Sequence, residues 1–597
     1  MEVLDRLCGL ETEYAMRFVP SDPSGGLPRH RLFSALVGAL RLQIPTVPAK
    51  HFKEGVFLAT GGAVWFEAER PAAGGGLIEG ATPECRGVRQ LIACQRAQDR
   101  LLADAAAKSG VDGKLTLIKN DQDAFGNTYG AQESYEACFA TGWRLLLWRV
   151  GLVAIFPLAF LTWVAILASV AGTLAYFVLA LACYLPIQVC TGGSRKWSLL
   201  LLGNNLVDGR ESHVQVPAWL ELVLQTATRV ITFPLAACLF LLLQLVAFRS
   251  QRRGLLAFLI TRPLVAGAGM VNRQGEFLLS DKGPTINCLT GFGGLLFDRP
   301  IFALGHFFKA IYADSWFSPR EYAILFSARQ RLQIGLGDSN MAQLAEYLRV
   351  GTTMLVLDAI EAGALVDPPR LRRPLFSLRQ VLADPWMRAK LKLRSGATVT
   401  ALEIQRYYWQ VCRDFVMTQC PHHQEAREVL RRWDEVLDGL HDLQATGQIP
   451  TSLIGKVDWA TKKRLLDGLD REASWEAKKK VDIRYHELTE SGYFQRLADA
   501  DLSWMVVSPA AIERATRTAP PHSPATTRGH YIREFAGGDE VVTANWRSVT
   551  LGHGWQAKTV RLAEHGPREQ PRGKAGSGAT ENDNRRTRLR PGGFELE

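Results

Sequence analysis

An apolar block in the first half of the chain limits the possible folds more than any other feature. No residue from Val150 to Ile187 is charged, and a second uncharged run extends from Val230 to Phe248. As one helix, the first run would be about 57 Å long at a rise of about 1.5 Å per residue. A bilayer has a hydrocarbon core of about 30 Å, so we expect this run to fold back once, near residues 169–172. The block is therefore predicted to be a multi-pass membrane segment.

Arginines flank the block on both sides. Arg144 and Arg149 precede it, and Arg249, Arg252 and Arg253 follow it. Because positive residues favour the cytoplasmic side, both outer ends of the block are predicted to be cytoplasmic. A buried helical hairpin in a soluble core is the alternative, although uncharged runs of this length are rare in soluble cores. A transporter or channel is disfavoured, since neither run holds the charge that marks a transport path.

The number of crossings depends on how the two flanking pieces are related. If they form one domain, the chain must cross the membrane an even number of times. A hairpin in the first run with a re-entrant or interfacial second run satisfies this condition. One additional pass near residues 199–206 satisfies it as well, and the sequence leaves both arrangements open.

The rest of the chain has the composition of an ordinary folded protein. Its 597 residues are 22% charged and 47% hydrophobic, which excludes a wholly disordered chain, a collagen-like chain and a small disulfide scaffold. The net charge of +11 permits contact with anionic lipid or acidic proteins but indicates no nucleic-acid partner. Ten cysteines without a CxxC pair indicate free thiols in a reducing compartment.

Changes in composition divide the chain into five pieces. Residues 1–139 alternate strand and helix patterns, residues 140–254 hold the apolar block, and residues 255–500 resume the mixed pattern. Residues 501–564 form a smaller C-terminal unit. Residues 565–597 are rich in Gly, Pro, Arg and Glu, so this tail is predicted to be disordered.

Acidic residues recur on short strand patterns in the first piece. In the segment 9–14, Glu11 and Glu13 are two residues apart, so both side chains would share one face of a strand. Paired carboxylates on a rigid strand suit Mg²⁺ beside nucleotide phosphates, although a solvated strand face is the simpler interpretation. Glu67 ends a second strand pattern, and a polar, turn-rich segment covers residues 119–135.

Several ordered motifs resemble one enzyme family. These are GLETEY, the ATPEC segment with Glu79 just before it, and KNDQDAFGNTYGAQESY, followed by ITR, GDSNM and VDIRYH later in the chain. Together they are similar to the enzymes of prokaryotic ubiquitin-like protein (Pup) modification, the Pup–protein ligases and the Pup deamidase/depupylases. The resemblance covers about residues 1–139 and 255–555, so it implies that the apolar block is an insertion into an enzyme domain.

This resemblance implies an α+β, glutamine-synthetase-like fold. A curved antiparallel sheet would form an active-site cradle, with helices behind it and a small C-terminal domain alongside. The implied activity uses ATP and Mg²⁺ to phosphorylate the side chain of a C-terminal glutamate on the ubiquitin-like modifier. A lysine of a target protein, here one in or near a membrane, would then form an isopeptide bond. Phosphorylation supplies the leaving group that a carboxylate lacks, and a carboxylate base would deprotonate the lysine.

The resemblance also assigns roles to individual residues. Glu67 falls at the position of the catalytic base, Glu11 and Glu79 match magnesium ligands, and Glu13, Glu84 and Glu133 are further candidate metal ligands. The candidate nucleotide-binding residues are Thr82, Trp546 and Arg331.

Three departures from the family pattern leave alternative functions open. Glu67 stands where the family has Asp, Trp65 where it has a metal-binding Tyr, and Ala63 where it has an ATP-binding Arg. A glutamate would shift the carboxylate by about 1.5 Å, which matters for proton transfer. The alternatives are a depupylase or deamidase of the same family, and a catalytically impaired membrane tether that binds nucleotide.

Overall fold

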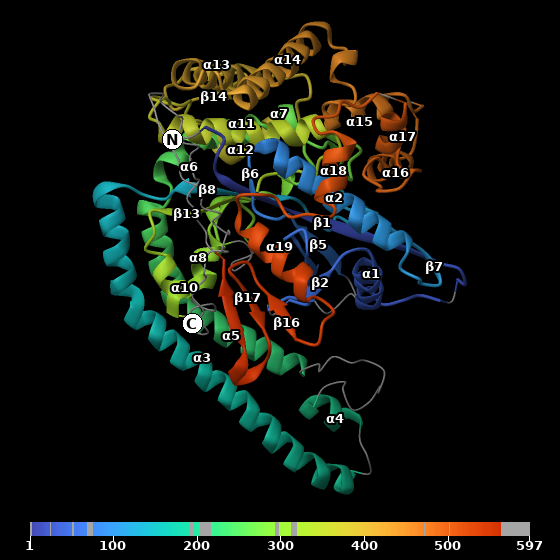
Figure 1. The fold of residues 1–597 in the computed structure, drawn as a ribbon, viewed down its shortest axis with the longest axis vertical. Helices are drawn as coiled ribbons and strands as arrows, with labels where there is room; N and C mark the ends of the chain where they lie inside the picture. Colours follow the sequence, from blue (N-terminus) through green and yellow to red (C-terminus); the bar gives the residue numbers. More distant parts are fainter. Residues whose placement is uncertain are drawn as a thin grey trace, which may run out of the picture.

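A body of sheets and helices carries a long helical hairpin along one side (Figure 1). The computed structural model describes residues 3–23, 25–50, 53–67, 76–191, 195–202, 217–292, 298–311, 319–470, 472–500 and 502–562. The tail predicted for 565–597 and most of the Gly-rich loop near residue 75 lie outside the described residues.

One large sheet, with strands in the order β11-β12-β13-β8-β1-β5-β4-β3-β2, forms the centre of the body. Its neighbouring strands are antiparallel except for β11 and β12, so the predicted α+β class with a largely antiparallel sheet is confirmed. β6 and β7 also pair with β1. The strands are β1 (Leu7–Pro20), β2 (Thr46–Pro48), β3 (Gly55–Leu58), β4 (Ala63–Glu67), β5 (Leu77–Ala81), β6 (Cys85–Arg86), β7 (Gly113–Ile118), β8 (Gln132–Cys138), β11 (Cys288–Gly291), β12 (Pro300–Ala303) and β13 (Arg329–Ile334).

The central strand β1 has one apolar face and one polar face. Along its first ten residues, buried and partly exposed positions alternate strictly, with Leu10 and Tyr14 on the buried face. Glu11 and Glu13 lie on the other face, as the sequence predicts, because successive side chains of a strand point to opposite sides.

Helices from both sides of the apolar block pack together behind the sheet. α11 (Gln343–Glu361) is the central one, and it contacts α2 (Val88–Ala107), α6 (Arg249–Thr261), α13 (Ala401–Gln419) and α14 (Gln424–Thr446). Most of α11 is buried. The pieces before and after the block therefore share one continuous core.

Shorter elements complete the body around this core. They are α1 (Arg29–Gln43), α7 (Pro263–Ala266), β9 (Met270–Val271), β10 (Phe277–Leu278), η3 (Gly283–Thr285), α8 (Gly305–Lys309), α10 (Pro319–Ile324), α12 (Pro374–Leu382), β14 (Leu391–Lys392), β15 (Thr398–Val399), η5 (Thr451–Leu453), α15 (Asp458–Asp467), α16 (Trp475–Tyr485), α17 (Tyr493–Asp499) and α18 (Pro509–Ala515).

A small C-terminal unit lies against the β2–β3 edge of the large sheet. It contains α19 (Pro524–Phe535), β16 (Val542–Ala544), β17 (Ser548–Leu551), η6 (Gly554–Gln556) and β18 (Lys558–Arg561). The amide of Lys50 donates to the carbonyl of Ala544 at 2.7 Å, which joins the unit to the chain next to β2. The domain boundaries that the sequence suggests stay predictions.

The apolar block forms two long helices. α3 (Gly142–Thr191) is continuous over 50 residues, the short α4 (Arg195–Leu202) follows, and α5 (Ala218–Val246) runs back beside α3 (Figure 1). The predicted fold-back at residues 169–172 is therefore wrong. A single glycine such as Gly172 weakens a helix but does not end it, and the Thr173 hydroxyl donates to the Ser169 carbonyl within the helix.

The two ends of the apolar block lie next to each other. The chain leaves β8 at Phe139 and re-enters the body at Phe248, and the Phe248 amide donates to the Phe139 carbonyl at 2.9 Å. Both ends of the block therefore meet at one point, and the additional pass considered near residues 199–206 stays untested. Part of that segment, 203–206, lies outside the described residues.

The first part of α3 is built into the core of the body. Trp148 is fully buried, its indole nitrogen donates to the Leu325 carbonyl at 2.7 Å, and its ring lies 4.6 Å from that of Phe139. Further along α3, the Trp163 indole donates to the Ile311 carbonyl at 3.2 Å. The C-terminal part of α3 extends away from the body (Figure 1).

We predict that Trp148→Ala lowers the free energy of unfolding by about 3–5 kcal/mol, the usual cost of truncating a large buried aromatic side chain. Trp143→Ala, on the same helix but at a position 66% exposed, should change it by less than about 0.5 kcal/mol. Chemical denaturation of both variants in the same detergent measures the difference. Equal stabilities would show that the start of α3 does not belong to the core.

Candidate active site

The register of the sheet places the predicted carboxylates next to one another. Glu13 pairs directly with Glu79 on β5, and Glu79 pairs with Trp65 on β4. Glu67 lies two residues after Trp65 on β4, and Glu11 lies two residues before Glu13 on β1, so both are on the same face. Directly paired residues point to the same side of a sheet, so these four glutamates, called the carboxylate row below, share the polar face.

A lysine that sequence reasoning missed lies within this row. Lys53 comes two residues before Gly55, which pairs with Trp65, so it lies opposite Glu67 in the same register. Its ammonium is 2.7 Å from a carboxylate oxygen of Glu79 and also forms an ion pair with Glu67. Burial alone would lower the pKa of Lys53, but Glu79 and Glu67 raise it above its usual value, so the ammonium stays charged.

Arg331 pairs with the other end of the row. It lies on β13, and its guanidinium reaches across β8 to Glu11 at 2.7 Å and to the Ser134 hydroxyl at 2.9 Å. Arg331 was expected to bind nucleotide. In this structure its partner is the carboxylate that was expected to bind magnesium.

Burial and neighbouring charges raise the pKa values of two of the glutamates. Burial raises the pKa of Glu13 to about 8, against the opposing charge of Lys282, and Glu79 adds to the increase. Burial and the charge of Glu11 raise the pKa of Glu79 to about 7, although Lys53 lowers it. A carboxylate oxygen of Glu13 also accepts the Gly130 amide at 3.0 Å, which holds the turn-rich segment 119–131 against the row.

The other two predicted nucleotide-binding residues, Thr82 and Trp546, lie toward the C-terminal unit. Thr82 is buried, and its hydroxyl accepts the backbone amide of Leu10 at 3.0 Å. The ring of Trp546 lies 5.0 Å from that of Phe57, and the guanidinium of Arg528 is 4.8 Å from the Trp546 ring. Trp546 therefore forms part of the contact between the C-terminal unit and the cradle.

Glu84, proposed from sequence as a metal ligand, has a different partner here. It pairs with Arg528, which is fully buried and also donates to the Gly61 carbonyl at 2.7 Å and to the Trp546 carbonyl at 3.0 Å. The pair joins α19 to the β3–β4 turn and to the segment after β5. In this structure Glu84 holds the C-terminal unit to the sheet.

Glu133 is not part of the carboxylate row. It pairs with Leu10 in the register, so it points to the opposite, buried face of the sheet. There it is completely buried and accepts from Arg262 at 2.7 and 2.8 Å and from the Tyr135 hydroxyl at 2.7 Å. The residue of β8 that does lie beside Glu11 on the polar face is Gln132.

The side chains in this conformation do not form a magnesium site. Among the residues that the structure describes, no three of His, Cys, Asp and Glu are arranged to hold a metal ion. Lys53 pairs with Glu67 and Glu79, and Arg331 with Glu11, so cationic side chains contact three of the four carboxylates. Trp65 offers no oxygen ligand, which Mg²⁺ requires.

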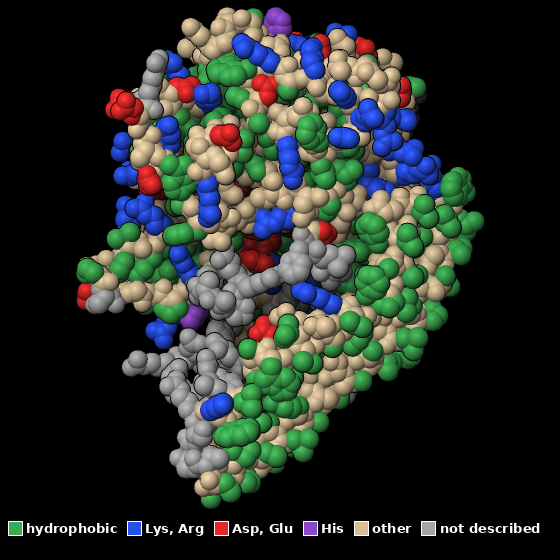
Figure 2. All heavy atoms as spheres, turned by 180° about the vertical axis from the view of Figure 1, so that it is seen from behind, with side chains coloured by type: hydrophobic (Ala, Val, Ile, Leu, Met, Phe, Trp, Pro, Cys, Tyr) green, Lys and Arg blue, Asp and Glu red, His purple; other side chains and the backbone are tan. Residues whose placement is uncertain are grey.

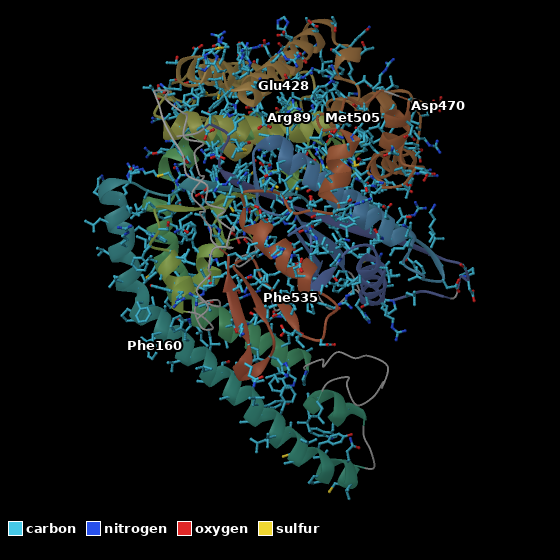
Figure 3. The ribbon with its side chains drawn as sticks, in the orientation of Figure 1. Arg89, Phe160, Glu428, Asp470, Met505 and Phe535 are labelled. Atoms are coloured by element: carbon cyan, nitrogen blue, oxygen red, sulfur yellow. The ribbon has the colours of Figure 1, made fainter. Side chains whose placement is uncertain are left out.

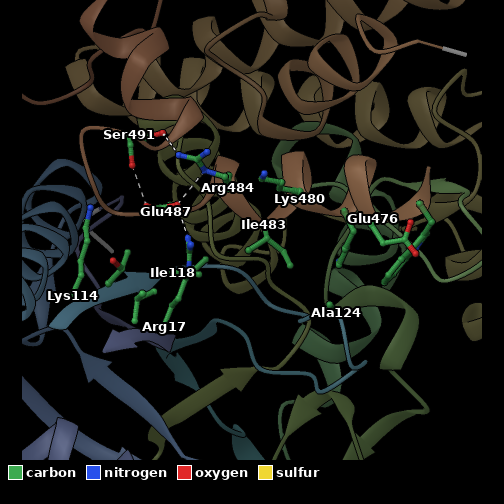
Figure 4. Close-up of a pocket in the computed structure, with 14 residues that line it drawn as sticks. Arg17, Lys114, Ile118, Ala124, Glu476, Lys480, Ile483, Arg484, Glu487 and Ser491 are labelled. Atoms are coloured by element: carbon green, nitrogen blue, oxygen red, sulfur yellow. Dashed lines mark hydrogen bonds and ion pairs between the residues drawn. The ribbon is translucent and has the colours of Figure 1, made fainter. Parts of the chain in front are cut away.

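A cavity with a largely basic lining lies further along β1. Arg17 is four residues beyond Glu13 on the same face, about 13 Å away at the usual strand rise, and it lines this cavity of about 600 Å³ between β1, β7 and α16. Other cationic side chains line it, as Figure 4 shows for Lys114, Lys480 and Arg484, together with Glu476 and Glu487. Lys479 also lines it. Arg17 and Arg484 both pair with Glu487 there, and the remaining cations leave the cavity with a net positive lining that suits an anionic segment.

The structure is thus a largely antiparallel cradle with a row of carboxylates, closed at one end by a small C-terminal unit. Residues 6–550 match the family described as Pup-ligase protein. The chain belongs to this family.

Individual relatives include both of the family's named activities. The chain is 32% identical to a depupylase of Acidothermus cellulolyticus over 51% of its length and 58% of the relative's. It is 31% identical to a Pup–protein ligase of Paenarthrobacter aurescens over 50% and 63% of the two lengths. These alignments span only about half of this chain. A Pup–protein ligase of Renibacterium salmoninarum is 23% identical over 92% of both chains.

Two solved structures share the fold. The complex between Pup and its ligase PafA has a TM-score of 0.62 at 21% identity and covers 94% of this chain and 89% of that one. PafA in complex with ADP has a TM-score of 0.55 at 20% identity, covering 86% and 87%. The predicted glutamine-synthetase-like architecture agrees with this likeness.

The raised pKa values predict a pH-dependent stability. A carboxyl group whose pKa is higher in the folded than in the unfolded state stabilises the fold at low pH, and this contribution is lost as the pH rises through the folded value. For Glu13 this loss of stability takes place between about pH 4.5 and about pH 8. Glu13→Gln should therefore stabilise the protein progressively more as the pH rises, by on the order of 4 kcal/mol more at pH 8.5 than at pH 5. Thermal unfolding across this range, with Glu276→Gln as the exposed control, measures the effect. A constant difference at all pH values would contradict it.

Proposed function

We propose that the chain is an ATP-dependent ligase that joins the side-chain carboxylate of a C-terminal glutamate, on a small ubiquitin-like modifier, to a protein lysine. The observation that carries this proposal is the carboxylate row in register on the polar face, with a basic cavity further along the same strand. Family membership and the complexes of PafA with Pup and with ADP support the modifier and the nucleotide.

The cavity gives the modifier a direction. Its cationic side chains would hold an acidic segment in extended form, with the terminal glutamate directed along β1 toward Glu13 and Glu67. The nucleotide would enter at the other end, between Thr82 and the C-terminal unit that carries Trp546. The carboxylate to be activated and the phosphate would then meet over the row.

Glu67 is the residue in position to act as the base. It lies at the end of β4, is partly exposed, and is held by the ammonium of Lys53. A lysine ammonium approaching the activated carboxyl must lose a proton before its nitrogen can attack, and a positioned carboxylate accelerates such a transfer by about 10²–10⁴-fold. The longer side chain of Glu, compared with Asp, is offset by its fixed contact with Lys53.

The test is conjugate formation by the detergent-purified full-length protein. With ATP, a modifier ending in glutamate and a lysine-containing acceptor, Glu67→Gln should lower the rate at least 100-fold. Glu11→Ala should abolish modifier-stimulated ADP release, and Glu276→Gln on the exposed β9–β10 turn should change neither. If the wild type binds nucleotide but forms neither ADP nor conjugate, the impaired tether replaces this proposal.

A depupylase is the second candidate, because a relative with that name is among the similar proteins. The same carboxylates would then direct water, rather than an amine, at an isopeptide bond. Incubating the protein with a preformed modifier–lysine conjugate separates the two. Release of the modifier, without formation of new conjugate, would favour the depupylase.

We also propose that the α3–α5 hairpin inserts into a membrane. Both helices are long and apolar enough to cross one. In α3 beyond Trp163, the exposed positions form one broad apolar face, as at Val164, Leu167, Leu174 and Val178. This part of α3 would be about 42 Å long, which exceeds a hydrocarbon core of about 30 Å.

The surface of the hairpin agrees with this proposal. Hydrophobic side chains cover its outer flank in Figure 2, and Phe160 lies on the outer side of α3 in Figure 3. Trp197 and Trp219, both partly exposed, lie near the far tip, where aromatic side chains favour a membrane interface. The antiparallel pair returns the chain to the side from which it came, so the body stays on one side.

A shortened hairpin tests the anchor without disturbing the core. Gly151 of α3 lies against Leu242 of α5, so helical positions near 166 and 227 also face each other in the antiparallel pair. Replacing residues 167–226 by a four-residue glycine–serine turn keeps Trp148 and Trp163 in place. The variant should stay monodisperse without detergent and leave the membrane fraction, whereas the full chain needs detergent. A full-length protein that is soluble without detergent would contradict the anchor.

A further inference from the structure

The carboxylate row holds a cation of its own. The Lys53 ammonium lies between Glu79, at 2.7 Å, and Glu67. The family resemblance makes Glu79 a metal ligand and Glu67 the base. The Lys53 side chain therefore contacts both of the residues between which a divalent ion would act.

Local packing explains why Lys53 reaches this position. Gly55, two residues further on, pairs with Trp65, and a Cβ at Gly55 would lie only 2.4 Å from the indole ring. The indole therefore covers the bare backbone of Gly55, with its ring 5.5 Å from Phe57 in an edge-on contact. With Trp65 turned this way, the space above Glu79 is left to the Lys53 side chain.

Two cationic side chains offset part of the negative charge of the row without a divalent ion. Lys53 and Arg331 supply two positive charges to Glu67, Glu79 and Glu11. A divalent ion bound at Glu79 would have to displace the ammonium and separate it from two carboxylates, which costs free energy in this partly buried site.

We propose that the Lys53 ammonium takes the place of a divalent ion at the Glu67–Glu79 end of the row. In this role Lys53 is a positioning residue: it fixes both carboxylates and supplies the positive charge that a nucleotide phosphate meets there. The part of this inference that concerns the nucleotide rests on the proposed function. The part that concerns competition between Lys53 and a metal ion does not depend on it.

The first experiment measures Mn²⁺ binding to the full-length protein in detergent, without nucleotide or modifier. Removing the ammonium frees two carboxylates, so Lys53→Met should bind Mn²⁺ at least tenfold more tightly than the wild type, by electron paramagnetic resonance titration. Lys53→Arg, which keeps the charge, should behave like the wild type. Lys50→Met removes an exposed lysine three residues away and should have no effect. Equal Mn²⁺ affinity of Lys53→Met and wild type would overturn the proposal.

The second experiment measures ATP binding by fluorescence anisotropy of a labelled analogue, with excess Mg²⁺ and with EDTA. The wild-type affinity should change less than threefold, whereas Lys53→Met should lose at least tenfold in EDTA. A wild type that binds ATP only with Mg²⁺ would overturn the proposal. A wild type that binds no ATP in either condition would instead contradict the proposed function, and the Mn²⁺ titration would still decide the role of Lys53.

Discussion

The alternation of side chains along β1 is the constraint on which the rest of the structure depends. One face of this strand carries Leu10 and Tyr14 into the core, and the other carries Glu11, Glu13 and Arg17. Four strands, β5, β6, β7 and β8, pair with β1, so its register sets which of their residues face the cradle. A shift of one residue would bury the glutamates and expose the core face. The site and the core are therefore specified by the same hydrogen bonds.

Part of this arrangement is readable from the sequence. The spacing of Glu11 and Glu13 is enough to place both on one face, and the motifs around Glu67 and Glu79 identify two further strands of the cradle. Glu133 could also have been placed correctly, because it alternates with Gln132 and shares its face with Tyr135 and Ala137, both buried. The resemblance of the motif led instead to a metal ligand, and the alternation decides against it.

Other features depend on contacts between distant residues. Lys53 pairs with Glu79 because Gly55 makes room for the Trp65 indole. No local sequence pattern predicts this pairing. The pairing of Glu84 with Arg528 joins residues more than 400 positions apart. The continuity of α3 does not follow from the sequence for a different reason. Bilayer thickness limits only the part of a helix that crosses a membrane, whereas the first part of α3 is a core helix and only its continuation leaves the body.

The meeting of Phe139 and Phe248 has a consequence for biosynthesis. β8 is complete before the hairpin is made, but its other neighbour, β13, follows the hairpin in the chain. During synthesis the half-finished sheet therefore presents an unpaired β8 edge, which is prone to aggregation, until β13 emerges. A hairpin that enters the bilayer in this interval would hold the nascent edge at the membrane surface, away from other chains, while the ribosome supplies its partner strand.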